Sequence, residues 1–375
     1  MIAVTGLSAL IWLFLVLARG GFWRADQRLG RAGELERWPD VVAVIPARNE
    51  AETIGETVSS LLAQDYPGDF RVVVVDDNST DGTGRAAGLS SRLRVISGRP
   101  LQDGWTGKLW AVNQGLELAG EIAPDAEYVL LTDADITHDP GNLRELVFKA
   151  EGENLHLVSL MVKLRCQSFW ERLLIPAFVF FFQKLYPFAW VNDPANRMAA
   201  AAGGCMLIRL DTLRRAGGVE PIRDRLIDDC AMAALIKAEG PIWLGLAGRT
   251  FSSRRYTRLS EIWHMVARTA FVQLDHSLFN LVGTVVAMVV IYLMPPTGIV
   301  AGLILDVPGL ILLGVAGWGM MSAAYRPTLK LYAMPPLFAL TLPVSGLLYT
   351  LMTISSAVRH WRGAGGAWKG RSYPK

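Results

Sequence analysis

Two runs of strand-forming apolar residues, each ending in aspartates, constrain the fold of this chain most. Unbroken apolar runs of this length predict strands that are buried on both faces, as in a parallel sheet. The carboxyl ends of such strands meet at one edge of the sheet, where α/β folds bind ligands. The sequence therefore predicts an acidic ligand site at that edge. The runs are residues 72–75, followed by Asp76 and Asp77, and residues 128–132, followed by Asp133 and Asp135.

The Asp-x-Asp step at the second strand suits a divalent cation. Asp133 and Asp135 are two residues apart, so strand alternation would point both side chains the same way. Hard cations such as Mg²⁺ or Mn²⁺ take oxygen ligands and keep substrate phosphates among them. Two carboxylates that close an apolar strand also repel each other unless a cation offsets them. We therefore expect an enzyme that handles a nucleotide diphosphate and a metal.

Strands and helices alternate in the predicted pattern between residues 41 and 240. The helix at 53–63 is predicted because its apolar residues recur at helical spacing. Alternation of this kind indicates right-handed parallel crossovers and an α/β domain. The predicted strands are 41–46, 72–75, 93–97 and 128–132, and the other predicted helices are 108–119 and 230–236.

The N-terminal segment, residues 1–18, carries no charge, and a basic flank of Arg19, Arg24, Arg28 and Arg31 follows it. A cleaved secretory signal has its basic flank before the apolar run. The order seen here predicts an uncleaved transmembrane anchor whose basic side faces the cytoplasm. A buried core helix is the alternative that the length also allows.

The C-terminal third accounts for much of the mean hydropathy of +0.30, which is high for a soluble enzyme. From Ser277 to Tyr325 only Asp306 is charged, which is enough for about two spans. Residues 331–358 are again uncharged but contain prolines, and residues 359–375 carry Lys and Arg without any acid. We expect transmembrane segments over 277–358 and a basic cytoplasmic tail over 359–375.

Three C-terminal spans would conflict with that tail, because they would place its basic residues outside the cell. Either residues 331–358 form a re-entrant or broken hairpin, or one segment within 277–325 does not cross. Both alternatives stay open. The predicted location is the cell membrane, in a bacterium the inner membrane, with several passes and with the α/β domain in the cytoplasm.

Residues 169–190 crowd nine aromatic side chains and two prolines into one stretch, with Arg172 and Lys184 interleaved. This composition makes a poor membrane span and favours an element that lies at the headgroup level. The alternative is a core helix with heavy aromatic packing.

Charge and cysteine content exclude some other classes. The net charge is only +3, so charge as a whole indicates no particular partner, and we expect no nucleic acid among the partners. Cys166, Cys205 and Cys230 show no Cys-x-x-Cys spacing, which indicates reduced thiols and not a disulfide frame or a zinc site.

Four motifs together resemble the family 2 glycosyltransferases in order, spacing and strand context over roughly residues 40–240. The membrane segments and the closing Arg-His-Trp-Arg-Gly and Trp-Lys-Gly-Arg motifs look like the hopanoid-biosynthesis-associated branch, and ceramide glucosyltransferases are similar in layout. The resemblance implies a GT-A type, Rossmann-like domain over 40–260 with flanking transmembrane helices. The four motifs are Pro46-Ala47-Arg48-Asn49-Glu50, Asp76 to Thr83, Gly107 to Gly115, and Asp133-Ala134-Asp135.

The resemblance also implies roles for single residues on the donor side. Asn49 and Glu50, after Pro46, would line the nucleoside pocket, although both also suit a helix N-terminus. Asp77, next to Asp76, would accept a hydrogen bond from the base.

Three more donor-side roles follow from the same resemblance. Lys108 would meet a phosphate, and its alternative is a solvated surface lysine. Asp135 would hold the metal, Mn²⁺ or Mg²⁺, and Asp133 would reach the ribose or the metal.

On the acceptor side, the family places an acidic pair whose second member is the general base, here Asp229. Asp228 and Asp229 could also be no more than a helix start. Gly203 and Gly204 resemble the loop that shapes the acceptor side, with a plain turn as the alternative.

One departure from the family concerns arginine. The chain has no Gln-x-x-Arg-Trp motif, which argues against a polymerising synthase. Arg254, Arg255 or Arg268 could contact the diphosphate instead.

The function implied is inverting transfer of a sugar from a nucleotide-diphosphate donor to a lipid hydroxyl. A UDP-sugar is the first choice of donor, and a hopanoid is the first choice of acceptor. Polyprenyl-phosphate or ceramide-type acceptors are alternatives of the same class. A non-catalytic membrane scaffold that only binds nucleotide is the alternative of another class.

Overall fold

The computed structural model describes residues 1–363, 367–368 and 371–372, and the chain divides into two compact units. The sheet unit comprises Asp26–Arg165 and Trp190–Arg255 with the end of the tail. The helical unit comprises Met1–Ala25, Cys166–Ala189 and Tyr256–Ala367. Each unit is described by itself.

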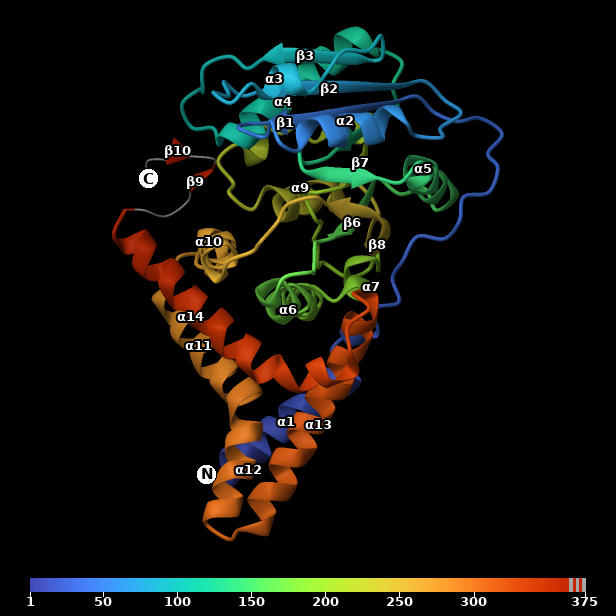
Figure 1. Cartoon of the computed structure of the whole chain (residues 1–375). Helices are drawn as coiled ribbons and strands as arrows, with labels where there is room; N and C mark the ends of the chain where they lie inside the picture. The colour runs from blue at the N-terminus through green and yellow to red at the C-terminus, as the bar shows by residue number, and fades with distance from the viewer. Residues whose placement is uncertain (364–366, 369–370, 373–375) are drawn as a thin grey trace. The chain divides into compact units, whose positions relative to one another are not determined.

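The sheet unit, within the described residues, is built on an eight-stranded sheet in the order β3-β2-β1-β4-β7-β6-β8-β5 (Figure 1). The strands are β1 (Val41–Ala47), β2 (Phe70–Asp76), β3 (Leu93–Ser97), β4 (Tyr128–Leu131), β5 (Ile136–His138), β6 (Leu157–Lys163), β7 (Met206–Arg209) and β8 (Ile242–Ser252), and a separate pair is formed by β9 (Ala367–Trp368) and β10 (Arg371–Ser372). The helices are α2 (Ile54–Leu62), α3 (Thr83–Ala86), α4 (Gly107–Ile122), α5 (Asn142–Gly152), α8 (Leu210–Arg215), η2 (Glu220–Ile222) and α9 (Asp228–Lys237).

The predicted α/β fold is confirmed, and its parallel part is the half made from β3, β2, β1 and β4. The second half departs from simple parallel winding, because β7 runs antiparallel to both β4 and β6. β5 is likewise antiparallel to β8. This last pairing matters for the site, because it lays the end of β8 beside the residues that precede β5.

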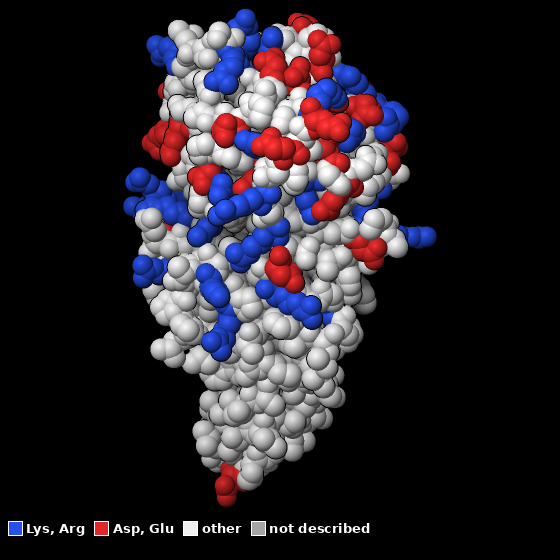
Figure 2. Space-filling model, turned by 90° about the vertical axis from the view of Figure 1, so that its right-hand side faces the viewer, with Lys and Arg blue, Asp and Glu red and all other residues white. Residues whose placement is uncertain are grey.

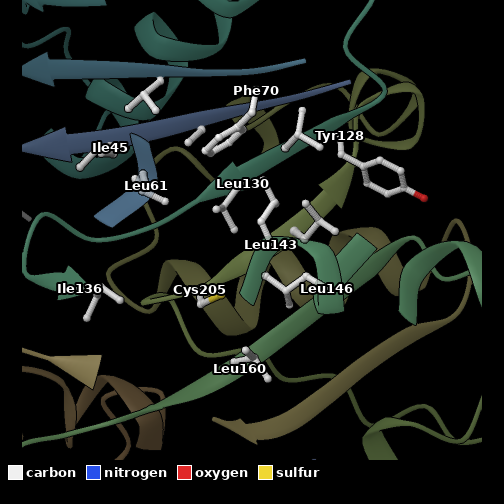
Figure 3. Close-up of a cluster of buried hydrophobic side chains, with 14 of the residues drawn as sticks. Ile45, Leu61, Phe70, Tyr128, Leu130, Ile136, Leu143, Leu146, Leu160 and Cys205 are labelled. Atoms are coloured by element: carbon white, nitrogen blue, oxygen red, sulfur yellow. The ribbon is translucent and has the colours of Figure 1, made fainter. Parts of the chain in front are cut away.

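The core of the sheet unit forms where the buried strand faces meet α2 and α5 (Figure 3). Ile45, Leu61, Leu130 and Leu146 are all completely buried there. β1 is buried at all seven positions, as expected of a central strand covered on both faces. Removal of this apolar surface from water contributes most to holding the strand ends, and therefore the site, in place.

Pro46 lies inside the central strand β1, which is unusual because proline cannot donate to a sheet ladder. The ladder between β1 and β4 ends at the pair Val44 and Leu131, before Pro46 is reached. On the other side, Pro46 is still paired in register with Val75 of β2. β1 and β4 therefore separate at Pro46, and this point, where the chain winds in opposite directions on either side, is the usual place for a ligand crevice.

Gly115 of α4 sets how closely this helix approaches the sheet. A Cβ atom on Gly115 would lie 2.3 Å from Val44 Cγ1 and 3.2 Å from Val75 Cγ2. We expect Gly115→Ala to lower the free energy of unfolding by about 1–3 kcal/mol through overpacking. Helix propensity alone predicts the opposite, a gain of about 1 kcal/mol. The measurement is the unfolding midpoint of the full chain in detergent.

The matched control is Gly120→Ala on the same helix, where a Cβ would meet nothing within 4 Å. That variant should be neutral or slightly more stable. Equal midpoints for the two variants would show that α4 can move away from β1 without cost.

The helical unit contains α1 (Ile2–Ala18), η1 (Phe22–Arg24), α6 (Phe169–Leu185), the start of α7 (Phe188–Val191), α10 (Leu259–Thr269), η3 (Val272–Leu274), α11 (Leu278–Met288), η4 (Val289–Leu293), α12 (Met294–Ile304), α13 (Pro308–Leu331), η5 (Pro336–Thr341) and α14 (Leu342–Trp361). Three stretches among the described residues are long and apolar enough to cross a membrane, namely Leu278–Ile304, Pro308–Leu331 and Pro336–Trp361. Figure 2 shows a broad surface almost free of charged side chains, as expected of such helices. These helices indicate membrane association. α1, at 17 residues, is a shorter apolar helix.

Small residues let α1, α12 and α13 pack closely together (Figure 1). A Cβ on Gly298 of α12 would lie 2.6 Å from Thr5 Cγ2 of α1, and one on Gly302 would lie 2.7 Å from Ile311 Cγ1 of α13. A Cβ on Gly314 would lie 2.6 Å from the Pro295 carbonyl oxygen. Close backbone approach through small residues is the usual way in which apolar helices associate in lipid, where the hydrophobic effect gives no drive.

Prolines in these helices leave carbonyl groups that other helices satisfy. Proline has no N–H, so Pro295 cannot donate to the carbonyl of Ile291 four residues earlier. The indole Nε1 of Trp12 donates to that carbonyl at 2.7 Å. In α6, Pro176 leaves the Arg172 carbonyl without its usual N–H partner. The next two carbonyls, those of Leu173 and Leu174, accept from the Ser345 and Tyr349 hydroxyls of α14 at 2.8 and 2.9 Å. In apolar surroundings each such unsatisfied carbonyl would be costly.

The aromatic stretch 169–190 forms mainly α6, which lies in the helical unit. Phe180 is fully buried and its ring packs 5.2 Å from that of Tyr325, whereas Phe169 is 65% exposed. Some aromatic residues of α6 therefore pack within the helical unit, and the interfacial placement of this segment stays a prediction. Part of the predicted basic tail, residues 364–366, 369–370 and 373–375, lies outside the described residues.

Candidate active site

The loop after β1 and the loop after β2 hold each other in place. Asn49 has a left-handed backbone (φ 51°), which asparagine tolerates well, and its Oδ1 accepts a hydrogen bond from the Thr80 N–H at 2.9 Å. The Asn49 N–H donates to Ser79 Oγ, and the Glu50 N–H donates to Thr83 Oγ1 at 2.9 Å. The two loops thus form one surface at the carboxyl ends of β1 and β2.

Asp76 and Asp77 have different surroundings despite being neighbours. The Asp76 carboxylate accepts hydrogen bonds from the Ser79 and Gly84 N–H groups, both at 3.0 Å, so it organises the turn that follows β2. Asp77 is only 1% exposed, and Arg48 donates to its backbone carbonyl. The Arg48 guanidinium also lies 3.9 Å from the Asp77 carboxylate. Asp77 is therefore a fixed acceptor at the floor of the loop surface.

Lys108, in the first turn of α4, connects two acidic segments. Its ammonium lies 2.9 Å from Asp133 Oδ1 and 3.0 Å from Asp228 Oδ2. A small hollow opens beside it where β1 and β4 separate, and its lining includes Pro46, Lys108, Asp133, Gly203 and Asp228. The alternative of a solvated surface lysine is therefore wrong, because the Lys108 side chain is only 21% exposed and is engaged on both sides.

Asp135 is held by the end of β8. Its Oδ2 accepts from Arg254 Nε at 2.8 Å and from Ser252 Oγ at 3.3 Å. A second donor of the same guanidinium, Nη2, bonds to Glu50 Oε1 at 2.6 Å. The backbone is fixed as well, since the Asp135 carbonyl accepts from the Ser253 N–H at 2.8 Å. Arg254 thus bridges the metal-ligand candidate and the loop after β1.

The structure corrects the reason given for grouping Asp133 with Asp135. β4 ends at Leu131 and β5 begins at Ile136, so both aspartates lie in the turn between the strands, and strand alternation does not apply to them. Thr57 of α2 donates to the Ala134 carbonyl at 3.0 Å and holds this turn. The two carboxylates instead have separate cationic partners, Lys108 and Arg254.

Asp229 lies in the first turn of α9, and its two oxygens are both engaged. Oδ2 accepts from the Gly203 N–H at 3.1 Å, and Oδ1 accepts from the Cys230 N–H at 2.8 Å. A Cβ on Gly203 would lie 3.2 Å from the Lys108 Nζ, so this glycine leaves space beside the lysine. Gly204 has a packing role, because a Cβ there would lie 2.9 Å from Val162 Cγ1.

The acidic residues of this site have shifted pKa values. Burial, and then the charge of Asp228, raise the pKa of Asp229 to about 6. Burial and the neighbouring aspartates also raise the pKa of Asp133, against the opposing charge of Lys108. For Lys108 itself, burial lowers the pKa, but Asp133 and Asp228 raise it by more, so the ammonium stays charged. Perturbed groups gathered in one hollow are typical of functional sites.

Asp133 and Asp135 offer the oxygen ligands that Mg²⁺ and Mn²⁺ prefer. No cluster of three or more His, Cys, Asp or Glu residues suited to a metal occurs in the part of the chain that the structure describes. This donor set fits a hard cation that completes its coordination with substrate phosphates and water. It does not fit a metal held entirely by protein.

The predicted site residues come together from distant parts of the sequence. Lys108, Asp133, Asp228 and Gly203 line one hollow, and Asp229 contacts Gly203 at its edge. The residue that the sequence named only as one of several possible diphosphate contacts is Arg254. Arg254 lies two residues after Ser252, the last residue of β8, but nothing in the sequence pairs that strand with Asp135.

Residues 42–216 match the family described as Glycosyl transferase family 2. The chain therefore carries a glycosyltransferase family 2 domain. The match includes Pro46, Lys108, Asp135 and Gly203, but it ends before Asp229.

Two curated relatives share part of this sequence. The succinoglycan biosynthesis protein ExoO of Rhizobium meliloti (strain 1021) is 33% identical over 135 residues, which are 34% of this chain and 36% of that protein. The 4,4'-diaponeurosporenoate glycosyltransferase of Staphylococcus aureus (strain USA300) is 38% identical over 95 residues, 25% of this chain and 23% of that protein. The chain thus matches about a third or less of the length of either relative.

A solved structure shares the fold over nearly the whole chain. The mannosyltransferase PcManGT from Pyrobaculum calidifontis, in complex with GDP-Man and Mn²⁺, superposes with a TM-score of 0.55 over 95% of this chain and 99% of that one. Sequence identity is 20%, so this similarity concerns the fold. It agrees with the predicted GT-A type arrangement.

Proposed function

We propose that this chain is a membrane-bound, inverting glycosyltransferase that moves a sugar from a nucleotide-diphosphate donor to a lipid hydroxyl. The donor we propose is UDP-linked, and the acceptor class is a hopanoid or a similar polycyclic isoprenoid lipid. A family 2 domain together with helices able to cross a membrane supports a lipid acceptor. The mannosyltransferase of similar fold holds Mn²⁺ together with a nucleotide sugar, which supports a metal-assisted donor site here.

One observation carries this proposal. Five carboxylates and two cations converge on the carboxyl ends of β1 and β4 and on the first turn of α9. These residues are Glu50, Asp133, Asp135, Asp228, Asp229, Lys108 and Arg254. A structural role needs far fewer charges, whereas transfer from a diphosphate needs cations for the leaving group and a carboxylate for the acceptor proton.

Each residue then has a task in the transfer. Asp77 accepts a hydrogen bond from the base of the donor. Asp133 and Asp135 would hold the divalent metal, which offsets the charge that develops on the leaving diphosphate. Lys108 adds a fixed positive charge at the same place.

Asp229 is the proposed general base. A raised pKa of about 6 keeps its carboxylate mostly ionised at neutral pH, and still basic enough to take a proton from the attacking hydroxyl. The Gly203 and Cys230 N–H groups fix the carboxylate, so its orientation toward an incoming acceptor does not depend on the substrate. Glycine at 203 keeps the approach open.

Two alternatives remain as competing proposals. A polyprenyl-phosphate or ceramide-type acceptor would use the same donor site. A scaffold that binds nucleotide without turnover would need none of the proton-transfer chemistry, and the presence of all the acidic residues opposes it.

The test is turnover by the full chain in detergent with UDP-sugars and GDP-sugars, with and without a bacterial lipid extract that contains hopanoids. We expect release of UDP from at least one UDP-sugar, dependent on Mn²⁺ or Mg²⁺ and increased by the extract, with a new glycolipid. Polyprenyl phosphate and ceramide serve as competing acceptors. Binding of UDP without release from any sugar nucleotide, with or without lipid, would favour the scaffold.

A further inference from the structure

Arg254 holds the carboxylate that the proposed metal needs. Its Nε bonds to Asp135 Oδ2 at 2.8 Å, and its Nη2 bonds to Glu50 Oε1 at 2.6 Å. The Asp135 and Glu50 side chains are only 11% and 12% exposed, whereas the guanidinium-bearing side chain is 34% exposed. The acids are therefore fixed in the protein, and the arginine is the member of the group with room to move.

The position of Arg254 follows from the sheet. β5 pairs antiparallel with β8, with Ile136 opposite Ser252. The strand end is tied to Asp135 by the backbone bond from Ser253, so Arg254 emerges beside the Asp135 side chain. The backbones of Arg254 and Asp135 are thus held together by the same hydrogen bond. When a ligand enters, only the Arg254 side chain needs to change its conformation.

Lys108 and Arg254 have parallel relations to the two aspartates. Lys108 offsets Asp133, and Arg254 offsets Asp135. Arg254 uses Oδ2 of Asp135, so a dication on the same carboxylate would lie close to the guanidinium even if it bound the other oxygen. Like charges that close together repel strongly in a partly buried site. Guanidinium and metal are therefore alternatives on Asp135.

Resting on the proposed function, we propose that Arg254 is an internal counter-cation that occupies the metal-binding carboxylate Asp135 in the metal-free protein and leaves it when the metal binds. The donor would keep Arg254 away from Asp135, because the diphosphate of the donor is an anion that a planar guanidinium can bind in bidentate fashion. Arg254 then makes metal binding and diphosphate binding cooperative, and it is a positioning residue, not a base.

The test measures Mn²⁺ binding by electron paramagnetic resonance to the full chain in detergent, without nucleotide. Arg254→Gln should bind Mn²⁺ more tightly than the wild type, by roughly fivefold to hundredfold, the usual size of a coupling between two sites. Arg254→Lys keeps the charge and should stay near the wild type. Asp135→Asn identifies the site, since the Mn²⁺ signal concerned must disappear in that variant.

Arg249→Gln is the matched control, because it removes the same charge from an exposed residue of β8 that pairs with Glu145 and not with Asp135. Its Mn²⁺ affinity should change by no more than about twofold. Equal or weaker Mn²⁺ binding by Arg254→Gln, in protein with an unchanged thermal midpoint, would overturn the proposal, because Arg254 would then support the metal ligand and not compete for it.

A second arm adds UDP. In the wild type UDP should tighten Mn²⁺ binding, and in Arg254→Gln this gain should be smaller, because the competitor is already gone. If the wild type binds neither UDP nor GDP with Mn²⁺, the proposed function fails, whereas the comparison with Mn²⁺ alone still decides the role of Arg254.

Discussion

Asp229→Asn should lower the rate of sugar transfer by roughly two to four powers of ten, the range for loss of a positioned general base. Asparagine keeps the size of the side chain and one of its two bonds from backbone N–H groups, but it cannot take a proton. Donor binding should barely change, since that pocket is built from Asp77, Asp133 and Asp135. The measurement is the transfer rate together with UDP affinity.

Variants of two neighbouring aspartates serve as controls for this prediction. Asp224→Asn removes an exposed carboxylate just before α9 and should leave transfer unchanged. If Asp228→Asn is inactive while Asp229→Asn is active, the base assignment is off by one residue. Normal transfer by both variants would mean that the acidic pair only begins a helix and that the base lies elsewhere.

The pH dependence follows from the same carboxylate. The base works when it is deprotonated, so kcat/KM should rise with pH through about 6, the raised pKa of Asp229, and then level off. The charge of Asp228 is one cause of that raised pKa. In Asp228→Asn the rise should therefore move to lower pH. If the rise in kcat/KM stays at the same pH in Asp228→Asn, the group whose titration causes it is not Asp229.

Asp135→Ala should abolish Mn²⁺- or Mg²⁺-dependent donor turnover, a loss of roughly a thousandfold or more, because metal stabilisation of a leaving diphosphate contributes several kcal/mol. The fold should survive, since Ser253 holds the backbone of residue 135 and not the carboxylate. The readouts are turnover with added metal and the thermal midpoint. Full activity of this variant, or wild-type activity unchanged in EDTA, would remove the metal from the proposed mechanism.

Asp125→Asn is the matched control for this prediction. Asp125 is exposed in the loop before β4, so the variant changes the charge of the same part of the chain without touching the site. It should keep both metal dependence and rate.

Local patterns were sufficient for most of the sheet unit. The valines of β2 and the apolar run of β4 predict buried strands because neither segment offers a polar face, and both were found within two residues of the expected ends. The spacing of apolar residues in α2 predicted a helix that buries Ile54, Val58 and Leu61. These predictions depend on periodicity, which needs no knowledge of distant residues.

Contacts between distant segments could not be predicted in the same way. The sequence predicts strand geometry at Asp133 and Asp135, but the structure has a turn there. That turn is held by Thr57 and Ser253, which lie far away in sequence. Arg254 reaches Asp135 only because β8 pairs with β5, and a pairing between strands more than a hundred residues apart leaves no local pattern. The charge of a site can be read from a sequence, but the partner of each charge depends on the sheet.

The bond from Trp12 to the Ile291 carbonyl has a consequence for biogenesis. α1 leaves the ribosome long before residue 291 does, since chains emerge N-terminus first. Neither Pro295 nor Pro296 has an N–H, so this segment would enter a bilayer with the Ile291 carbonyl unsatisfied by its own helix. In the folded chain Trp12 of α1 supplies that donor, so this carbonyl is satisfied by a helix that is synthesised much earlier than its own.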